Sequence, residues 1–404
     1  MTSRASSEIV VDDEAIIAFT RELVRVRSVN DPAGAGSEAE AADLVAERMR
    51  SFGWDPVVEE VAPGRPNVVA VVDGGGDPGP TLMFEGHTDV VTEGDLAAWT
   101  VDPYGADLRD GRIYGRGSAD MKSGVAAMLY AVKALQDAGE FPGRVVVAAL
   151  VDEEGMMLGA KHFARTALAA EIDGVIVCEP EAGEICPTSK GAVRLRLDLT
   201  GAMAHGAMPQ EARNPLAVAA AVVTGLPALE KALQDGHGEH EHLGWTYLTP
   251  TVVLGGDVDQ INVIPATATV CVDARTVPGV DHAAMVAAVG DLARRAGTAA
   301  GVEVELTVVD DRPAVSTPLD DPVVRALHRA HESVVGEPAR YGGVPGSTDG
   351  TILTRDAGLA TVVYGPGGKW IAHQADEYVE VDEILRCARV YAHAAREFLT
   401  EADR

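Results

Sequence analysis

Hydrophobic positions recur along the first half of the chain with two different periods. Apolar residues repeat every three to four positions in residues 14–28 and 38–52, which predicts two amphipathic helices. Nearly continuous apolar runs predict buried strands, and they alternate with further helical patterns. The strands are expected at 67–72, 81–84, 144–151 and 173–178, and the helices at 123–138 and around 160–170. This alternation is typical of a largely parallel sheet with helices on both faces.

The pattern changes in the middle of the chain. From about residue 190 to 309 it predicts the order strand, helix, strand, strand, helix, strand, which forms a compact βαββαβ unit. After residue 310 the alternation of helices and buried strands returns, with a helix at 320–335 and a strand at 359–364. We therefore expect an α/β fold with a mixed, largely parallel sheet. Its larger domain would comprise residues 1–189 and 310–404, interrupted by an inserted domain at 190–309.

Length and composition narrow the classes of protein. A chain of 404 residues exceeds the size at which one core stops growing, so two domains are expected. The net charge of −29 argues against nucleic acid or an anionic membrane as a partner, because both require a basic surface. No apolar run approaches the roughly 18 residues of a membrane span, and the N-terminal residues have no signal-peptide core. We expect a soluble, cytoplasmic protein.

Cysteines and clustered histidines do not by themselves indicate a metal site. Cys178, Cys186, Cys271 and Cys387 lack the CxxC spacing of a thiolate zinc site, so buried free thiols are expected. The histidine-rich segment GHGEHEH at 236–242 lies between a helix and a strand of the inserted unit. Its glycines and glutamates favour a solvated loop.

Histidine and acidic residues gather instead at the ends of the predicted strands. His87 and Asp89 follow the run TLMF, Glu153 and Glu154 follow VVVAALV, and Glu179 follows VIVC. Asp120 precedes a predicted helix, and His373 follows the strand near residue 364. Ligands of open α/β sheets bind at the carboxyl ends of the strands. Converging histidine and carboxylate side chains there predict a site for zinc or a similar divalent ion.

The spacing of these residues suggests a division of roles. In the pattern HxD, His87 can bind metal through one ring nitrogen while Asp89 accepts a hydrogen bond from the other. Consecutive extended residues project to opposite sides, so Glu153 and Glu154 cannot do the same job. One of them can bind the metal while the other faces the attacking water.

Five motifs in this order resemble a known family. GHTDVV, GRGSADMKSG, DEEG, VCEP and HQADEYVE are similar to those of the zinc aminoacylases and metallopeptidases. This family includes acetylornithine deacetylase, succinyl-diaminopimelate desuccinylase and glutamate carboxypeptidases. The resemblance spans nearly the whole chain, and it implies a catalytic domain with two divalent ions, normally zinc, although cobalt or manganese is an alternative. It also implies that the inserted domain serves as a lid and dimerisation domain.

The resemblance implies a role for each matching residue. His87 and Glu179 would bind one ion, Glu154 and His373 the other, and Asp120 would bridge the two. Glu153 would be the general base, and Asp89 the partner of His87. His205 in AHGAMP would donate to the oxyanion, and in dimeric members it enters the active site of the neighbouring chain. We therefore expect a homodimer that forms through the inserted domain.

Substrate contacts are also implied by matching positions. Asn262 and Arg275 would face the substrate, and arginine suits a carboxylate through its bidentate fork. The loop residues Gly346, Ser347 and Thr348 resemble a glycine-rich loop that could cradle the same carboxylate. The chain departs from the family at Glu181, where other members often have a small polar residue. The pocket for the substrate side chain stays unassigned.

The favoured function is metal-dependent hydrolysis of an amide bond beside a free carboxylate. Deacylation of an N-acyl amino acid is preferred, with a dipeptidase or carboxypeptidase of the same family as the alternative. A non-catalytic binding protein belongs to another class, and intact Glu153 and metal ligands argue against it. A dehydrogenase is disfavoured because no GxGxxG sequence follows a strand.

Overall fold

The computed structural model describes residues 8–30 and 38–401. The N-terminal residues are expected to lack a signal-peptide core, and residues 1–7 of that segment lie outside the described part of the chain. The chain divides into two compact units. The large unit comprises residues 1–188, 316–344 and 348–404, and the small unit comprises residues 189–315 and 345–347.

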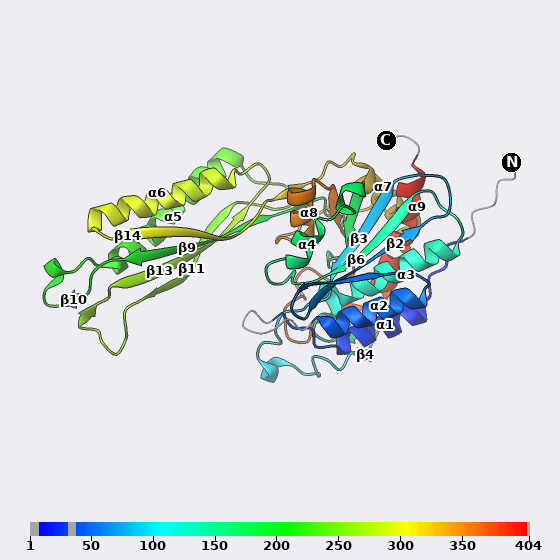
Figure 1. The fold of residues 1–404 in the computed structure, drawn as a ribbon, viewed down its shortest axis with the longest axis horizontal. Helices are drawn as coiled ribbons and strands as arrows, with labels where there is room; N and C mark the ends of the chain where they lie inside the picture. The colour runs from blue at the N-terminus through cyan, green and yellow to red at the C-terminus, as the bar shows by residue number, and fades with distance from the viewer. Residues whose placement is uncertain (1–7, 31–37, 402–404) are drawn as a thin grey trace. The chain divides into compact units, whose positions relative to one another are not determined.

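A six-stranded sheet forms the centre of the large unit (Figure 1). Its strand order is β1-β2-β6-β3-β7-β16, and the pairs from β6 to β16 are parallel. Strands β1 and β2 pair antiparallel, as do β2 and β6, so the sheet is mixed and largely parallel as predicted. The strands are β1 (Val57–Ala62), β2 (Arg65–Asp73), β3 (Thr81–His87), β6 (Arg144–Leu150), β7 (Gly174–Val177) and β16 (Thr361–Val363).

Helices cover both faces of this sheet. One core cluster joins the sheet to α1, α2, α3, α7 and α9, and it includes Phe84 of β3 and Tyr391 of α9. A second cluster joins the opposite face to α4 and α8 through Phe163 and Ile352. The helices are α1 (Asp13–Arg25), α2 (Ala39–Ser51), α3 (Ser123–Asp137), α4 (Leu158–Phe163), α7 (Pro322–Val335), α8 (Asp349–Ala357) and α9 (Val381–Thr400).

The small unit has the predicted βαββαβ order. Its four strands form an antiparallel sheet in the order β11-β13-β9-β14, and α5 and α6 pack on one face through a separate core. Val193 and Leu195 of β9 point into this core, while Arg194 and Arg196 alternate with them. The elements are β9 (Gly191–Thr200), α5 (Pro215–His237), β11 (Tyr247–Gly255), β13 (Thr267–Thr276), α6 (His282–Ala300) and β14 (Glu303–Arg312).

Short elements complete both units. A three-stranded sheet in the large unit has the order β17-β5-β4, and the small unit adds the pair β10 and β12. These strands are β4 (Asp107–Arg109), β5 (Arg112–Tyr114), β17 (Tyr378–Glu380), β10 (Ala204–His205) and β12 (Val263–Ile264). Two short strands, β8 (Thr188–Ser189) and β15 (Val315–Ser316), lie where the chain passes from one unit to the other. The short helical segments are η1 (Leu96–Ala98), η2 (Ser118–Lys122), η3 (Ala169–Glu171) and η4 (Pro209–Glu211).

One helix corrects a statement made from the sequence. Among the described residues, α5 is long and apolar enough to cross a membrane by length and composition, and its uncharged run at 215–229 is longer than was expected. Alanine and valine raise its mean hydropathy, but Val218, Val222 and Leu226 pack against the sheet of the same unit. Its last two turns contain Glu230 and Lys231. The helix is therefore weak evidence for a membrane contact.

The cysteines and the histidine-rich segment match their predictions in most respects. All four cysteines are free, and three are buried, whereas Cys271 is only partly buried. The segment at 236–242 contains the end of α5 and the loop that follows it, and most of its residues are exposed.

Candidate metal centre

The parallel register brings the predicted strand ends to one edge of the large sheet. His87, the last residue of β3, pairs with Leu150 of β6, and Glu85 pairs with Val177 of β7. The acidic residues that follow β6 and β7 therefore emerge beside His87. The neighbouring strands thus deliver the polar residues at their ends to a single place.

The five predicted metal ligands meet at this edge. His87 Nε2 lies 3.1 Å from Asp120 Oδ1 and 3.4 Å from Glu179 Oε1. His373 Nε2 lies 3.2 Å from Asp120 Oδ2 and 2.8 Å from Glu154 Oε1. Asp120 thus presents one carboxylate oxygen to each imidazole. The arrangement has the donor types and spacing that a pair of divalent cations requires.

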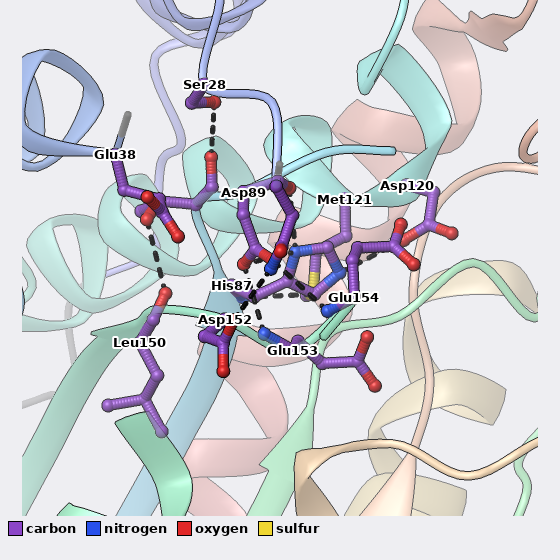
Figure 2. Close-up of polar contacts among 12 residues, drawn as sticks. Ser28, Glu38, His87, Asp89, Asp120, Met121, Leu150, Asp152, Glu153 and Glu154 are labelled. Atoms are coloured by element: carbon purple, nitrogen blue, oxygen red, sulfur yellow. Dashed lines mark hydrogen bonds and ion pairs between the residues drawn. The ribbon is translucent and has the colours of Figure 1, made fainter. Parts of the chain in front are cut away.

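Two groups of three side chains are compact enough to hold an ion. The first is His87, Asp120 and Glu154, and the second is His87, Glu153 and Glu179, with the candidate ligand atoms of each group within 4.8 Å of one another. Figure 2 shows the Asp120 and Glu154 carboxylates near each other, while Glu153 extends in a different direction. Glu153 therefore lies beside the ligands but separately from Glu154. Both residues belong to a turn and not to the extended segment expected from the sequence, so the turn and not strand alternation separates their side chains.

Asp89 contacts both His87 and the acidic loop after β6. His87 Nδ1 lies 2.9 Å from the backbone carbonyl of Asp89 and 3.5 Å from its Oδ1 atom, so the carbonyl makes the shorter contact. The Asp89 carboxylate accepts the backbone N–H groups of Glu153 and Glu154, at 3.2 and 3.1 Å. Asn30 Nδ2 donates to it as well, at 2.8 Å. These bonds fix the positions of both glutamates.

A buried polar network supports this loop, and the sequence alone did not indicate it. Asp152 adopts a left-handed backbone, with φ of 66°, at the turn that leads to Glu153. Its Oδ1 atom accepts hydrogen bonds from Arg65 Nη1 at 2.5 Å and Asn30 Nδ2 at 2.9 Å. Arg65 also donates to Glu38, at 2.8 Å. Asn30 and Arg65 lie far from the motifs along the chain, so only the tertiary structure connects them to the site.

The protonation behaviour of the site fits a cation centre. Burial, together with the charge of Asp120, raises the pKa of Glu179 to about 8. Hydrogen bonds to Asp120 and Glu154 raise the pKa of His373 to about 11. Burial alone would lower the pKa of His87, but Glu179 and Asp120 raise it well above its usual range. Without a metal, protons must offset the crowded carboxylates, and divalent ions can replace those protons.

Burial is also the main cause of the raised pKa of Glu153. The charge of His87 opposes the rise, and the charges of Glu179 and Glu154 add to it. The Glu153 side chain is one of several carboxyl groups that lie close together at this site. A carboxylate with a raised pKa is better suited to accept and return a proton near neutral pH.

The predicted residues of the small unit form two separate groups. His205 lies on β10, whose pairing with β12 places it beside Val263, and the N–H of Gly206 donates to the carbonyl of Asn262 at 2.7 Å. Arg275 lies near the far end of β13. The eight steps along the strand from Thr267 to Arg275 span on the order of 27 Å. Asn262 is therefore close to His205, and the structure does not bring it together with Arg275 inside the unit.

Arg275 and the glycine-rich loop have local partners. Asp273 accepts hydrogen bonds from Arg275 Nε and Nη2, at 2.6 and 3.2 Å. Ser347 Oγ lies 3.5 Å from Arg312 Nη1. Thr348 is buried and directly precedes α8, while Gly346 and Ser347 belong to the small unit.

Glu181, the departure from the family pattern, has a cationic partner. Lys369 Nζ lies 2.8 Å from Glu181 and 2.9 Å from Glu184. Glu181 is buried, and Cys186 Sγ donates to it at 3.2 Å. Lys369 thus balances the charge that this substitution adds beside Glu179.

Comparisons with known proteins agree with this geometry. Residues 83–397 match the family described as Peptidase family M20/M25/M40. A succinyl-diaminopimelate desuccinylase of Rhodospirillum centenum is 32% identical over 395 residues, which cover 93% of this chain and 95% of the relative. A protein of the same name from Caulobacter vibrioides is 31% identical over 417 residues, with coverage of 98% and 99%.

Solved structures share the fold. A tripeptidase from Staphylococcus aureus has a TM-score of 0.79 at 20% identity, with 96% of this chain and 99% of that chain covered. A protein of Bacillus subtilis described as a dinuclear metal binding peptidase from the M20 family has a TM-score of 0.73 at 16% identity, with coverage of 96% and 98%. The family match over most of the chain is the stronger result: this chain belongs to peptidase family M20/M25/M40 and is a metal-dependent hydrolase.

Proposed function

We propose that this enzyme hydrolyses the amide bond of an N-acyl amino acid with a free carboxylate, and that N-succinyl amino acids are its preferred substrates. The position of Asp120 between His87 and His373, with Glu153 beside them, is the observation that carries the proposal. The desuccinylases that match over nearly the whole chain favour the succinyl group. A dipeptidase or carboxypeptidase of the same family is the second candidate, because the fold is shared with solved peptidases of both kinds.

In this proposal the five ligands hold two divalent ions. His87 and Glu179 would hold one, Glu154 and His373 the other, and Asp120 would contact both. When bound, such a pair polarises the scissile carbonyl and makes water a better nucleophile at neutral pH. Zinc suits the imidazole and carboxylate donors, and cobalt or manganese can occupy the same set.

Glu153 would act as the general base. It takes a proton from the attacking water and returns it to the departing amine, which typically contributes about 10² to 10⁴ in rate. Two features of the chain support this role. The backbone N–H of Glu153 donates a hydrogen bond to Asp89, and burial raises the pKa of the Glu153 side chain. Asp89 also contacts the Nδ1 atom of His87, so it would orient that ligand.

Recognition of the substrate carboxylate is assigned to Arg275 and to the loop of Gly346, Ser347 and Thr348. A guanidinium can donate two parallel hydrogen bonds to a carboxylate. The backbone and hydroxyl groups of the loop can add donors to the same anion. Arg275 keeps about a third of its side chain exposed while paired with Asp273, so it is accessible to a ligand.

We also propose a homodimer in which His205 and Asn262 serve the partner's site. They lie together at the strand pair β10 and β12 of the small unit, whereas Arg275 lies near the far end of β13 in the four-stranded sheet. Strand β11 ends the order of this sheet, and Val253 and Leu254 on it are 53% and 62% exposed. An open, apolar strand edge is suited to pairing with a second copy. His205 would then donate to the oxyanion of the reaction in the neighbouring chain.

Cytoplasmic localisation also belongs to this proposal. The free cysteines are consistent with a reducing compartment, and small N-acyl amino acids would be the substrates there.

A substrate comparison tests the proposed function. Purified protein loaded with Zn²⁺ or Co²⁺ is assayed with N-succinyl-L,L-diaminopimelate, N-acetylornithine and a panel of dipeptides. The highest kcat/KM is expected for the succinyl substrate, and its carboxamide analogue should be a poor substrate. Faster cleavage of dipeptides would favour the second candidate. No turnover of any substrate by protein with two bound ions would support a binding protein instead.

A further inference from the structure

Glu377 is a fully buried carboxylate that holds the backbone beside Asp120. Its Oε1 atom accepts the N–H groups of Ala119 and Asp120, at 3.0 and 3.1 Å. Its Oε2 atom accepts a hydrogen bond from Arg116 Nη1, at 2.5 Å. Both oxygens of one side chain are thus used, and two of their three donors belong to the segment that carries Asp120.

The backbone of this segment needs such an acceptor. Asp120 has φ of −115° and ψ of 97°, and Met121 also departs from helical geometry. Ala119 and Asp120 lie just before α3, so their backbone N–H groups have no acceptor within that helix. A buried N–H without a partner is costly, so the Glu377 carboxylate stabilises this particular conformation. The direction of the Asp120 side chain depends on that backbone.

Arg116 completes the arrangement. Its side chain is only 2% exposed, and its guanidinium lies over the ring of Trp99, with 5.2 Å to the centroid. Its backbone N–H donates to the carbonyl of Pro103. Burial raises the pKa of Glu377 to about 7, and the positive charge of Arg116 opposes that rise, so the guanidinium offsets part of the cost of burying the carboxylate.

Glu377 also connects two parts of the metal centre. It lies four residues after His373 and directly before β17, and its own carbonyl accepts the N–H of Gly115. One residue therefore ties the loop that carries His373 to the segment that carries Asp120. These are two of the three residues assigned to the second ion.

We propose that Glu377, held by Arg116, is a positioning residue that sets the orientation of Asp120 and thereby the affinity of the site for its second divalent ion. The inference rests on the proposed function, since it requires the two-ion site. It adds a residue that touches neither ion nor substrate.

The test is Co²⁺ binding by the full-length protein after chelation, with wild type, Glu377→Gln and Glu380→Gln compared. In Glu377→Gln, the new side-chain amide places an NH₂ group against either Arg116 or the two backbone N–H groups. Loss of a hydrogen bond that supports a metal ligand typically lowers metal affinity about 10- to 100-fold. We expect that loss for the second Co²⁺ equivalent, together with a changed visible absorption spectrum.

Glu380→Gln is the matched control. Glu380 of β17 pairs with Arg112 of β5, at 2.8 Å, but both side chains are partly exposed, and their pair does not involve residues 119 and 120. The control should bind two Co²⁺ ions as the wild type does. If Glu377→Gln also retains wild-type affinities and spectrum, the inference is wrong.

Arg116→Lys provides an independent variant in case Glu377→Gln does not fold. It keeps the charge but loses the guanidinium geometry, so a weaker second site is again expected, while the Tm of the metal-free protein stays near that of wild type. Unchanged Co²⁺ binding by this folded variant would contradict the inference. Wild-type protein that binds fewer than two ions would overturn the proposed function itself, and the inference with it.

Discussion

The carboxylate of Asp89 accepts the backbone N–H of Glu153, with 3.2 Å between the nitrogen and Oδ1. This bond joins the end of β3 to the acidic loop after β6. Because Asp89 also contacts His87, one buried residue fixes both a metal ligand and the proposed base. The HxD pattern therefore does more than set the tautomer of a histidine.

We predict that Asp89→Asn weakens metal binding about 10- to 100-fold and lowers activity to a similar degree. The amide keeps the shape of the side chain but cannot accept all the hydrogen bonds that the carboxylate accepts. A chelator competition titration measures the change. The control is Asp95→Asn, since exposed Asp95 also accepts a backbone N–H, from Ala97, away from the site. Wild-type affinity in Asp89→Asn would remove this role.

The second prediction concerns pH and metal removal. In the metal-free protein the pKa of Glu179 rises from 4.5 to about 8, and that of His373 from 6.5 to about 11. In both cases the folded state holds a proton that the unfolded state releases, so stability is lost as pH rises through these windows. Metal ions need the deprotonated ligands, so their apparent affinity increases over the same range.

The measurement is Tm with EDTA and with Co²⁺ from pH 6 to pH 8.5. The difference between the two Tm values should grow with pH, and metal binding should release protons to the buffer. A difference that stays constant, with no proton release, would show that the ligands do not hold protons in the metal-free state.

The sequence predicted most of the sheet and the five side chains that meet at the candidate metal centre. Strands such as 144–151 are buried on both faces, so their apolar runs are visible, and motif order identified Asp120 and His373 although they lie far apart in the chain. The predictions did not include α8 and α9. They also did not include the antiparallel edge strand β1, whose residues are mostly exposed and carry no clear apolar pattern.

The supporting residues could not be predicted for a different reason. Asn30 and Arg65 lie outside the motifs of the residues that they support. Glu377 belongs to the motif of His373, but that spacing does not indicate its contact with residues 119 and 120. Their contacts depend on the packing of distant segments, which hydrophobic periodicity does not encode. The pairing of Glu181 with Lys369 is similar, because an acidic residue in the sequence does not reveal its buried partner.

The third prediction tests carboxylate recognition by Arg275. Arg275→Ala should raise KM and lower kcat/KM by about 1.5 to 3 kcal/mol for substrates with a free α-carboxylate. Substrates in which that carboxylate is an amide should lose much less. Arg196→Ala is the control, because Arg196 makes the same kind of pair with Asp198 on the neighbouring strand. Equal losses on acid and amide substrates would assign Arg275 a structural role.

The fourth prediction is complementation between chains. Glu153→Ala and His205→Ala homodimers should each be nearly inactive. Reassembly of an equal mixture gives about half heterodimers, each with one intact site, so activity should return to about a quarter of wild type. If verified heterodimers stay as inactive as their parents, His205 acts within its own chain or has a structural role.

The most direct test of the account is metal content and turnover in Glu153→Ala, compared with Glu154→Ala. The central claim is that the first glutamate moves a proton and the second holds an ion. Glu153→Ala should therefore bind two ions per chain and hydrolyse N-succinyl-L,L-diaminopimelate about 10² to 10⁴ times more slowly than wild type. Glu154→Ala should bind the second ion weakly. Loss of both ions from Glu153→Ala, or wild-type turnover by it, would contradict the claim.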